Sequence, residues 1–340
     1  MLKMGLIGYG LWGKHHARAL HQTDGIELCA IACASPASAA AARDDYPHVP
    51  VVMGYENLLG LAQIEAVAIV TPNHLHAEMT LAALKAGKDV LLEKPMALSV
   101  ADCALINDLA KKLGRCVSLV HQFRLSTQWG AMKNWIDSGE MGEPLHAHIS
   151  LFRFPYRPGS GAWRYSREEV GSWILEEPIH FFDSVMWYFE KLGNPISIQS
   201  TGNSRSGVIG MEENFSCMLR WSSGAYATIT QTLSGFENHQ VVELIGSLGA
   251  ARGWWSGATD RTRQPMFELK RKRHFAESVE TVEIGPSGEL FELAETYRRI
   301  AAAFASKKPL VSGQEAAKRI HVCLEAERAL SMRHELALIF

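Results

Sequence analysis

The sequence predicts an α/β protein of two domains, a doubly wound parallel sheet followed by an α+β domain with a largely antiparallel open sheet. Three observations predict this class. The chain opens with an apolar strand that runs into a Gly-x-Gly-x-x-Gly turn and a helical pattern. Short apolar strands then alternate with helical segments as far as Val120, which is typical of a parallel sheet covered on both faces. From His146 onward, strands follow one another without helices between them, which favours antiparallel pairing.

The first domain is expected to span residues 1–123, because alternating strand and helix patterns fill that stretch. Its apolar runs predict strands at residues 3–8, 27–34, 51–52, 66–70, 89–92 and 116–120. The intervening segments predict helices at residues 14–21, 38–46, 74–85 and 100–113, and Ser99 is a good N-cap for the last of them.

The second domain is expected to span residues 124–340, since a chain of 340 residues exceeds what one hydrophobic core usually serves. A connecting helix at 129–138 precedes strands at 146–153, 196–202, 214–220, 225–233 and 239–245, with weaker strands between 252 and 284. Helices at 289–305 and 314–332 close the chain. One face of the antiparallel sheet is then available to pack on a helix or on a partner.

The glycine turn after the first strand has the spacing that a dinucleotide site needs. Gly8 permits a tight turn, Gly10 lets the backbone approach a pyrophosphate, and Gly13 allows close packing of the helix on the strand. The helix then presents unpaired N–H groups to the phosphates. We therefore predict an N-terminal Rossmann domain. Its expected cofactor loop comprises Gly8, Tyr9, Gly10, Leu11, Trp12 and Gly13.

The end of the second strand bears on the choice of cofactor. An acidic residue there would bind the ribose 2′-OH of NAD, but the sequence reads Cys33-Ala34-Ser35-Pro36. No neighbouring arginine is present to bind the 2′-phosphate of NADP either. We favour NAD over NADP, with Ser35 as a candidate ribose contact.

Composition argues against several classes of partner. Lys plus Arg number 34 and Asp plus Glu 36, for a net charge of −2, so no basic excess is available to neutralise nucleic acid. No apolar run reaches the length of a membrane span, and the first strand begins too early to leave room for a cleavable leader. We therefore expect a cytoplasmic protein with no membrane or nucleic-acid partner.

Metal binding and disulfides are not expected. Six cysteines are scattered without a Cys-x-x-Cys pair, which indicates reduced core residues. The pairs His74/His76 and His146/His148 lack a nearby cluster of cysteine or carboxylate ligands.

Two further motifs fall where strands of the first domain should end, at residues 70–76 and 92–95, and ligands of open α/β sheets bind at those ends. With Thr71-Pro72-Asn73-His74-Leu75-His76 and Glu93-Lys94-Pro95 in view, the chain resembles the Gfo/Idh/MocA family of NAD(P)-dependent oxidoreductases over nearly its whole length. The resemblance implies that Lys94 is catalytic, close to the nicotinamide and the substrate. It also implies cofactor contacts at Thr71, Pro72, Asn73, His76, Glu93 and, at the domain junction, Gln122.

Residues 171–183 resemble the family's helix in which an aspartate precedes a histidine by four residues. Here Glu176 and His180 have that spacing, which on one helix would let the carboxylate orient the imidazole. We expect His180 to be the general base and Glu176 its orienting partner. Glu176 stands where most members have aspartate, and Pro178 where many have glycine, which affects site geometry and substrate choice.

The loop before this helix carries Arg153, Trp163 and Arg164, and its Trp-Arg pair resembles one that borders the substrate in many relatives. An indole can stack on a sugar, and arginines can bind hydroxyls, a carboxylate or a sulfonate. Arg124 and Glu177 are further candidate substrate contacts. The alternative is a solvated basic loop or a subunit contact.

The predicted function is hydride transfer between NAD(P) and a hydroxyl of a sugar, sugar acid or cyclitol. One alternative is a glycoside hydrolase that uses bound NAD in a transient oxidation, elimination and reduction. Another is a non-catalytic, cofactor-sensing regulator. The resemblance also implies a homodimer or homotetramer formed through the sheet of the second domain.

Overall fold

The computed structural model describes residues 1–204, 211–257, 265–332 and 336–340. The chain divides into two compact units, and each is described by itself. The first unit comprises Met1–His121, Glu168–Gly171 and Leu293–Ile320. The second comprises Gln122–Arg167, Ser172–Glu292 and His321–Phe340.

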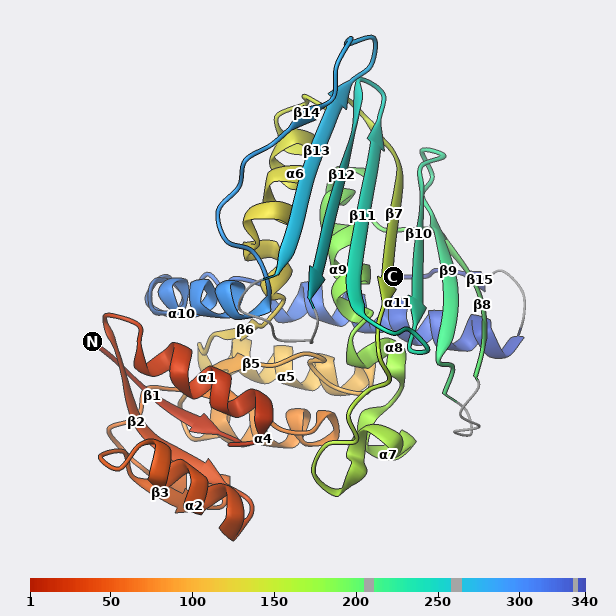
Figure 1. The fold of residues 1–340 in the computed structure, drawn as a ribbon. Helices are drawn as coiled ribbons and strands as arrows, with labels where there is room; N and C mark the ends of the chain where they lie inside the picture. The colour runs from red at the N-terminus through yellow and green to blue at the C-terminus, as the bar shows by residue number, and fades with distance from the viewer. Residues whose placement is uncertain (205–210, 258–264, 333–335) are drawn as a thin grey trace. The chain divides into compact units, whose positions relative to one another are not determined.

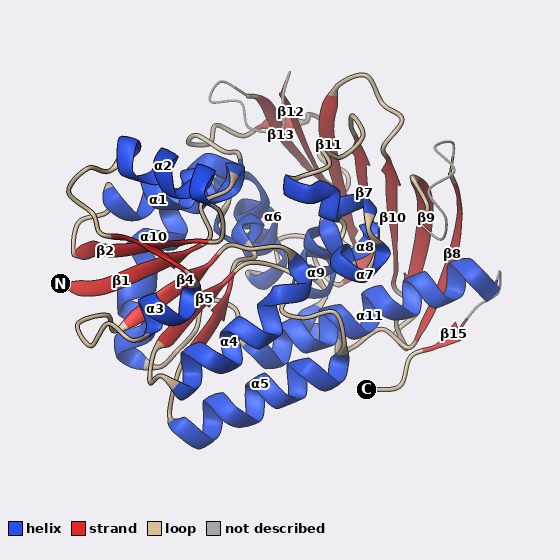
Figure 2. Cartoon of the chain, turned by 90° about the horizontal axis from the view of Figure 1, so that it is seen from below, coloured by secondary structure: helices blue, strands red, loops and turns tan. Residues whose placement is uncertain are grey.

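The first unit contains a parallel sheet with strand order β3-β2-β1-β4-β5-β6. Its strands are β1 (Leu2–Ile7), β2 (Ile26–Cys33), β3 (Val51–Met53), β4 (Ala66–Ile69), β5 (Asp89–Leu92) and β6 (Val117–Leu119). Its helices include α1 (Leu11–His21), α2 (Pro36–Asp45), α3 (Tyr55–Leu59), α4 (His76–Lys85) and α5 (Val100–Leu113). Figure 2 shows α1 and α2 on one face of the sheet and α3, α4 and α5 on the other. The predicted doubly wound sheet is confirmed, and its strand order reverses between β1 and β4.

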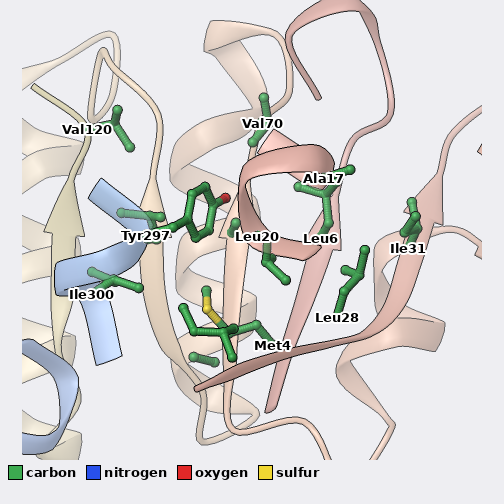
Figure 3. Close-up of a cluster of buried hydrophobic side chains, with 14 of the residues drawn as sticks. Met4, Leu6, Ala17, Leu20, Leu28, Ile31, Val70, Val120, Tyr297 and Ile300 are labelled. Atoms are coloured by element: carbon green, nitrogen blue, oxygen red, sulfur yellow. The ribbon is translucent and has the colours of Figure 1, made fainter. Parts of the chain in front are cut away.

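Part of the C-terminal region packs in the hydrophobic core of the first unit. Met4 and Leu6 of β1 pack with Leu20 of α1 in one hydrophobic cluster. Tyr297 and Ile300 of α10 (Glu289–Ser306) belong to the same cluster (Figure 3). The first unit therefore includes residues 293–320, whereas the sequence analysis places them in a domain of residues 124–340. An amphipathic pattern predicts that a helix buries one face, but it does not identify the core that receives this face.

The second unit is built on a sheet with strand order β14-β13-β12-β11-β7-β10-β9-β8-β15. Its strands are β7 (Pro144–Phe152), β8 (Ser197–Asn203), β9 (Asn214–Arg220), β10 (Tyr226–Thr232), β11 (Asn238–Gly246), β12 (Gly249–Gly257), β13 (Met266–Arg273), β14 (Glu280–Thr281) and β15 (Leu336–Ala337). The pair β7 and β10 is parallel and the other neighbours are antiparallel, which confirms the prediction of a largely antiparallel sheet. Residues 258–264, within the stretch expected to carry weaker strands, lie outside the described residues.

The two faces of this sheet differ. On β7 the buried residues Ala147, Ile149 and Leu151 alternate with partly exposed residues such as His148 and Phe152. Helices α6 (Thr127–Asp137) and α9 (Ile179–Tyr188) pack on the sheet (Figure 1). The period-two pattern in the sequence arises because, in the strands that the structure describes, one face is more deeply buried than the other.

The remaining helices are α7 (Arg167–Val170), α8 (Trp173–Glu176) and α11 (Gly313–Met332), together with short 3-10 turns such as η1 (Asn73–Leu75) and η2 (Gln122–Leu125). None of the helices in the described ranges has the length and apolar character needed to cross a membrane. The six cysteines carry free thiols, and all but Cys29 are buried.

Glu292 is a buried carboxyl group of the second unit whose pKa can be tested. The residue is 2% exposed, and its Oε1 accepts hydrogen bonds from Gly288 N (3.0 Å) and Ser287 Oγ (3.1 Å). Burial raises the pKa of Glu292 to about 7. The native state thus holds this proton more tightly than the unfolded state, so stability is lost as pH rises from about 4.5 to about 7, by up to about 3 kcal/mol.

Glu292→Gln keeps the Oε1 acceptor and removes the charge. We expect the Tm of this variant to exceed that of the parent by a margin that grows from pH 5 to pH 8, measured by differential scanning fluorimetry. A difference in Tm that stays constant over this range would show that the carboxyl does not titrate as described.

Candidate functional site

The glycine turn is closely packed on its protein side and open on the other. Gly8 has φ +102°, and a Cβ built on it would lie 2.1 Å from Val70 O. A Cβ on Gly13 would lie 2.3 Å from Gly8 O, but one on Gly10 would meet no atom within 4 Å. Helix α1 begins after Gly10 with no side-chain cap. The structure therefore has the open cradle and the uncapped helix N-terminus that a pyrophosphate requires.

Side chains of this loop have different surroundings. Leu11 is exposed, whereas Tyr9 is buried and donates its hydroxyl to Asp45 Oδ2 at 2.8 Å. Trp12 donates Nε1–H to Glu93 Oε1 at 2.8 Å. The polar groups of Tyr9 and Trp12 therefore contact the protein, which leaves the backbone as the loop's natural ligand surface.

Ser35 lies in the exposed turn between β2 and α2. Its Oγ accepts a hydrogen bond from Ser38 N at 3.2 Å and so caps α2. The cap explains locally why a serine precedes Pro36.

The turn after β4 carries the next group of expected cofactor contacts. Among the described residues, the buried Thr71 Oγ1 has no hydrogen-bond partner, a deficit that a bound ligand would satisfy. Pro72 precedes η1, and Asn73 Nδ2 donates to Val170 O at 3.1 Å. His76 is 0% exposed, and its ring nitrogens lie 2.6 Å from Pro95 O and 3.0 Å from Thr71 O. The imidazole bridges the turns that follow β4 and β5, and its contact with the cofactor stays a prediction.

Lys94 is half-buried and lies just beyond the end of β5, and the peptide bond to Pro95 is cis. The adjacent Glu93 is 4% exposed, with Oε1 against Trp12 Nε1 and His16 Nε2 and Oε2 against Lys94 N. Burial alone would raise the pKa of Glu93, but His16, Lys94 and Trp12 outweigh it and hold the pKa at about 2. Glu93 is therefore a buried carboxylate that accepts a hydrogen bond from the backbone of Lys94, and its contact with the cofactor stays a prediction.

The predicted single helix across Glu176 and His180 is wrong. Helix α8 ends at Glu176, Glu177 has φ −128°, and α9 begins at Ile179 after Pro178. Proline lacks an N–H and disfavours helical geometry in the residue before it, so Pro178 interrupts the helix. Glu176 and His180 therefore do not have the i, i+4 relation of a continuous helix.

Three arginines expected to bind substrate pair with carboxylates of their own unit. Arg164 Nε donates to Glu176 Oε1 at 2.5 Å, and Arg153 pairs with Glu177. Arg124 binds Asp183 through two hydrogen bonds, of 2.6 and 2.8 Å. Glu176, Glu177 and Asp183 are all buried. A buried carboxylate needs such a partner because desolvation penalises its charge.

Aromatic rings surround two of the expected site residues. The guanidinium of Arg164 lies 4.3 Å from the centre of the Trp163 ring and covers one face of the indole. His180 is 4% exposed, and its ring centre lies 4.9 Å from that of Phe123. Gln122, at the start of η2, is also buried.

Sequence reasoning missed Asp183 and His16. Asp183 follows His180 by three residues on α9, so the two share a helix face, which is the signal that could have identified it. His16 follows Trp12 by four residues on α1 and meets the same carboxylate, a relation visible only once Glu93 is placed.

The His-x-His pairs have other roles. His146 stacks on Tyr226 with ring centres 4.4 Å apart, and His148 Nδ1 lies 2.8 Å from Thr228 Oγ1. Across the part of the chain that the structure describes, no three His, Cys, Asp or Glu side chains are grouped to hold a metal ion.

Two family models match the chain. One, described as "Oxidoreductase family, NAD-binding Rossmann fold", matches residues 2–121. The other, described as "GFO/IDH/MocA C-terminal domain", matches residues 129–252.

Among curated proteins, inositol 2-dehydrogenase of Salmonella typhimurium is 37% identical over 189 residues, which are 55% of this chain and 54% of that protein. A 1,5-anhydro-D-fructose reductase of Ensifer adhaerens is 28% identical over 249 residues, 70% of this chain and 73% of that protein. The match spans about half the length of the inositol 2-dehydrogenase.

Solved structures show the same fold. The aldose-aldose oxidoreductase of Caulobacter crescentus has a TM-score of 0.84 at 20% identity, covering 99% of both chains. The scyllo-inositol dehydrogenase of Lactobacillus casei, solved with bound NAD(H) and scyllo-inositol, has a TM-score of 0.80 at 18% identity, again over 99% of both.

Proposed function

Because this chain belongs to the Gfo/Idh/MocA family, we propose that it is an NAD(P)-dependent oxidoreductase acting on a hydroxyl group of a polyol. The observation that carries the proposal is the glycine turn, which is closed by the backbone of Val70 at Gly8 and by its own backbone at Gly13, and is open at Gly10. The half-buried Lys94 follows a strand of the same sheet. In open α/β sheets, ligands bind at the carboxyl ends of such strands.

In this proposal the backbone around Gly10 and the first turn of α1 hold the pyrophosphate. Thr71, Pro72 and Asn73 flank the nicotinamide ribose, and the Thr71 hydroxyl gains the partner that it lacks in the described structure. When bound, the nicotinamide accepts or donates the hydride.

The catalytic roles that we propose follow from the chemistry of two side chains. The ammonium of Lys94 donates a hydrogen bond to the reacting oxygen and stabilises the negative charge that develops on it. A neutral imidazole at His180 accepts the hydroxyl proton as the carbon loses hydride, and returns it in the reverse direction. Glu176 pairs with Arg164 through Oε1, and its orienting role toward His180 stays a prediction.

We propose that the substrate is uncharged, a neutral sugar or a cyclitol. Arg124, Arg153 and Arg164 are each neutralised by a carboxylate of the same unit, so none contributes a net positive charge for an anionic ligand. A sugar acid would have to compete with buried carboxylates for these guanidinium groups, at a cost in binding free energy. Hydroxyl groups can use the remaining N–H donors without separating the pairs.

The test is a screen of neutral sugars, inositols and the matching uronic acids for absorbance change at the nicotinamide band, with NAD and NADP in parallel. We expect stoichiometric NADH formation and a kcat/KM at least about 10-fold higher for the neutral compound of each pair, which corresponds to about 1.4 kcal/mol. Preference for the uronic acids would contradict the uncharged substrate. Release of an alcohol without net NADH would instead indicate the glycosidase chemistry, and binding without turnover would indicate a regulator.

The preference for NAD over NADP and the oligomeric state are also proposals. NAD is favoured because residues 33–36, the turn that contains Ser35, include no cationic side chain that could bind the 2′-phosphate of NADP. We propose a homodimer or homotetramer through the second unit's sheet, whose less buried face presents the exposed residues Leu145 and Tyr226. In this proposal, the second unit carries both substrate binding and association.

A further inference from the structure

Four side chains of the first unit form a hydrogen-bonded network that the proposed reaction does not use. Trp12 Nε1 donates to Glu93 Oε1 at 2.8 Å, and His16 Nε2 lies 2.9 Å from the same oxygen. His16 Nδ1 lies 2.9 Å from the hydroxyl of Tyr297. His16 and Tyr297 are 0% exposed and Glu93 is 4% exposed, so solvent has little access to these contacts.

The chemistry of the network assigns its protons. Glu93 is a carboxylate and only accepts, so His16 Nε2 must carry the proton that lies between them. His16 Nδ1 lies at hydrogen-bond distance from the hydroxyl of Tyr297, and which of the two donates depends on whether the imidazole carries a second proton. Burial and the charge of Glu93 raise the pKa of Tyr297 well above its usual value, which keeps the hydroxyl protonated. Trp12 Nε1–H and His16 Nε2–H thus both donate to the same oxygen of Glu93.

This network connects three elements of the first unit. Trp12 and His16 lie one turn apart on α1, the helix that follows the glycine turn. Tyr297 comes from α10, and lies in the core beside Leu20 and Val70 (Figure 3). The second carboxylate oxygen of Glu93 accepts a hydrogen bond from Lys94 N at 3.1 Å. One buried carboxylate is therefore shared between the helix of the glycine turn and the backbone of Lys94.

We propose that His16 and Tyr297 are positioning residues for Lys94, because together they hold the Glu93 carboxylate in the orientation that fixes the Lys94 backbone relative to α1. The inference rests on the proposed function, in which Lys94 is catalytic. Small misplacements of a catalytic group are costly in rate. Loss of the network should therefore lower kcat and leave dinucleotide binding nearly unchanged, since neither residue belongs to the glycine turn.

Tyr297→Phe removes the hydroxyl with little change in volume, and Tyr188→Phe is a matched control. Tyr188 is 1% exposed and donates its hydroxyl to Trp129 O at 3.2 Å in the second unit. We expect both variants to lose a similar amount of Tm. Only Tyr297→Phe should lower kcat, by about 5- to 10-fold, with the KM for NAD changed less than about twofold.

A second pair of variants tests the imidazole. His16→Gln can still present an N–H to Glu93, whereas His16→Leu cannot. We expect the glutamine variant to retain a kcat at least about fivefold above that of the leucine variant. Equal kcat values in these two variants, at equal Tm, would overturn the proposed role of His16.

Amide hydrogen exchange of the Lys94 peptide, followed by mass spectrometry over residues 89–98, tests the network without turnover. Exchange should become faster in Tyr297→Phe and His16→Leu, and remain unchanged in Tyr188→Phe. If exchange responds in this way but the parent protein oxidises no polyol, the positioning network stands and the proposed function fails. Unchanged exchange at Lys94 in Tyr297→Phe, or a loss of kcat no larger than that of Tyr188→Phe, would overturn the inference.

Discussion

Replacing Lys94 by alanine is expected to lower kcat about 1000-fold, because the reacting oxygen would lose both its ammonium hydrogen bond and the charge that stabilises the developing alkoxide. The dinucleotide Kd should change less than about threefold, since the side chain of Lys94 does not form the glycine turn. Steady-state rates with the preferred polyol give the first quantity, and quenching of NADH fluorescence gives the second. Lys112→Ala, on the exposed side of α5, is the control and should change neither.

His180→Ala should lower kcat by about 10²- to 10⁴-fold for the complementary reason, the loss of the group that accepts the hydroxyl proton. Two added compounds test these roles separately. Small primary amines should partly restore the activity of Lys94→Ala, and imidazole should partly restore the activity of His180→Ala. Lys94→Arg keeps the charge on a planar group of different shape and should remain impaired. Near-normal rates in both alanine variants would refute the assignment of these roles.

The strand and helix pattern of the first unit could be predicted because local rules and tertiary structure agree there. Ser99, for example, caps α5 as expected, with its Oγ accepting from Asp102 N at 3.0 Å. The sequence of β1 (Leu2–Ile7) is apolar because the strand lies between β2 and β4 and helices cover both faces of the sheet (Figure 2). The packing of α10 in the core of the first unit could not be predicted, because Tyr297 contacts His16 across a sequence separation of 281 residues.

The second unit's polar residues show a different limit. The sequence identifies Arg153 and Arg164 as cations in one loop and Glu176 and Glu177 as acids in the next segment. It does not reveal that they pair with one another, because ion pairing depends on the path of the loop between them. The pairs neutralise these guanidinium groups, which is why the cations alone are a poor guide to the charge of the substrate.

At Pro178 a local rule and a spacing rule conflict, and the structure follows the local rule. A separation of four residues places two side chains on one helix face only if the helix is continuous. Proline disfavours helical geometry in the residue before it, and Glu177 indeed leaves that geometry. Functional sites are where such conflicts between local and family patterns are expected.

Gly8→Ala is expected to lower stability and Gly10→Ala to weaken dinucleotide binding, although the two positions are only two residues apart. At Gly8, a Cβ would lie 2.1 Å from Val70 O on a backbone with φ +102°, so clash and strain together should destabilise the first unit by at least about 3 kcal/mol. We expect its Tm to fall by about 6–12 °C in thermal scans. Gly10 has φ −82° and ψ −165°, which alanine adopts readily, and a Cβ there meets nothing within 4 Å.

Gly10→Ala should therefore keep the parent Tm to within about 1 °C and yet weaken dinucleotide binding at least about 10-fold, because the added methyl group occupies the space through which the backbone approaches the pyrophosphate. Isothermal titration with NAD and NADP measures the affinity, and Gly114→Ala, at a positive-φ position far along the sequence in the cap of α5, controls for glycine substitution as such. An unchanged Kd in a folded Gly10→Ala variant would mean that the open side of the turn is not where the dinucleotide binds.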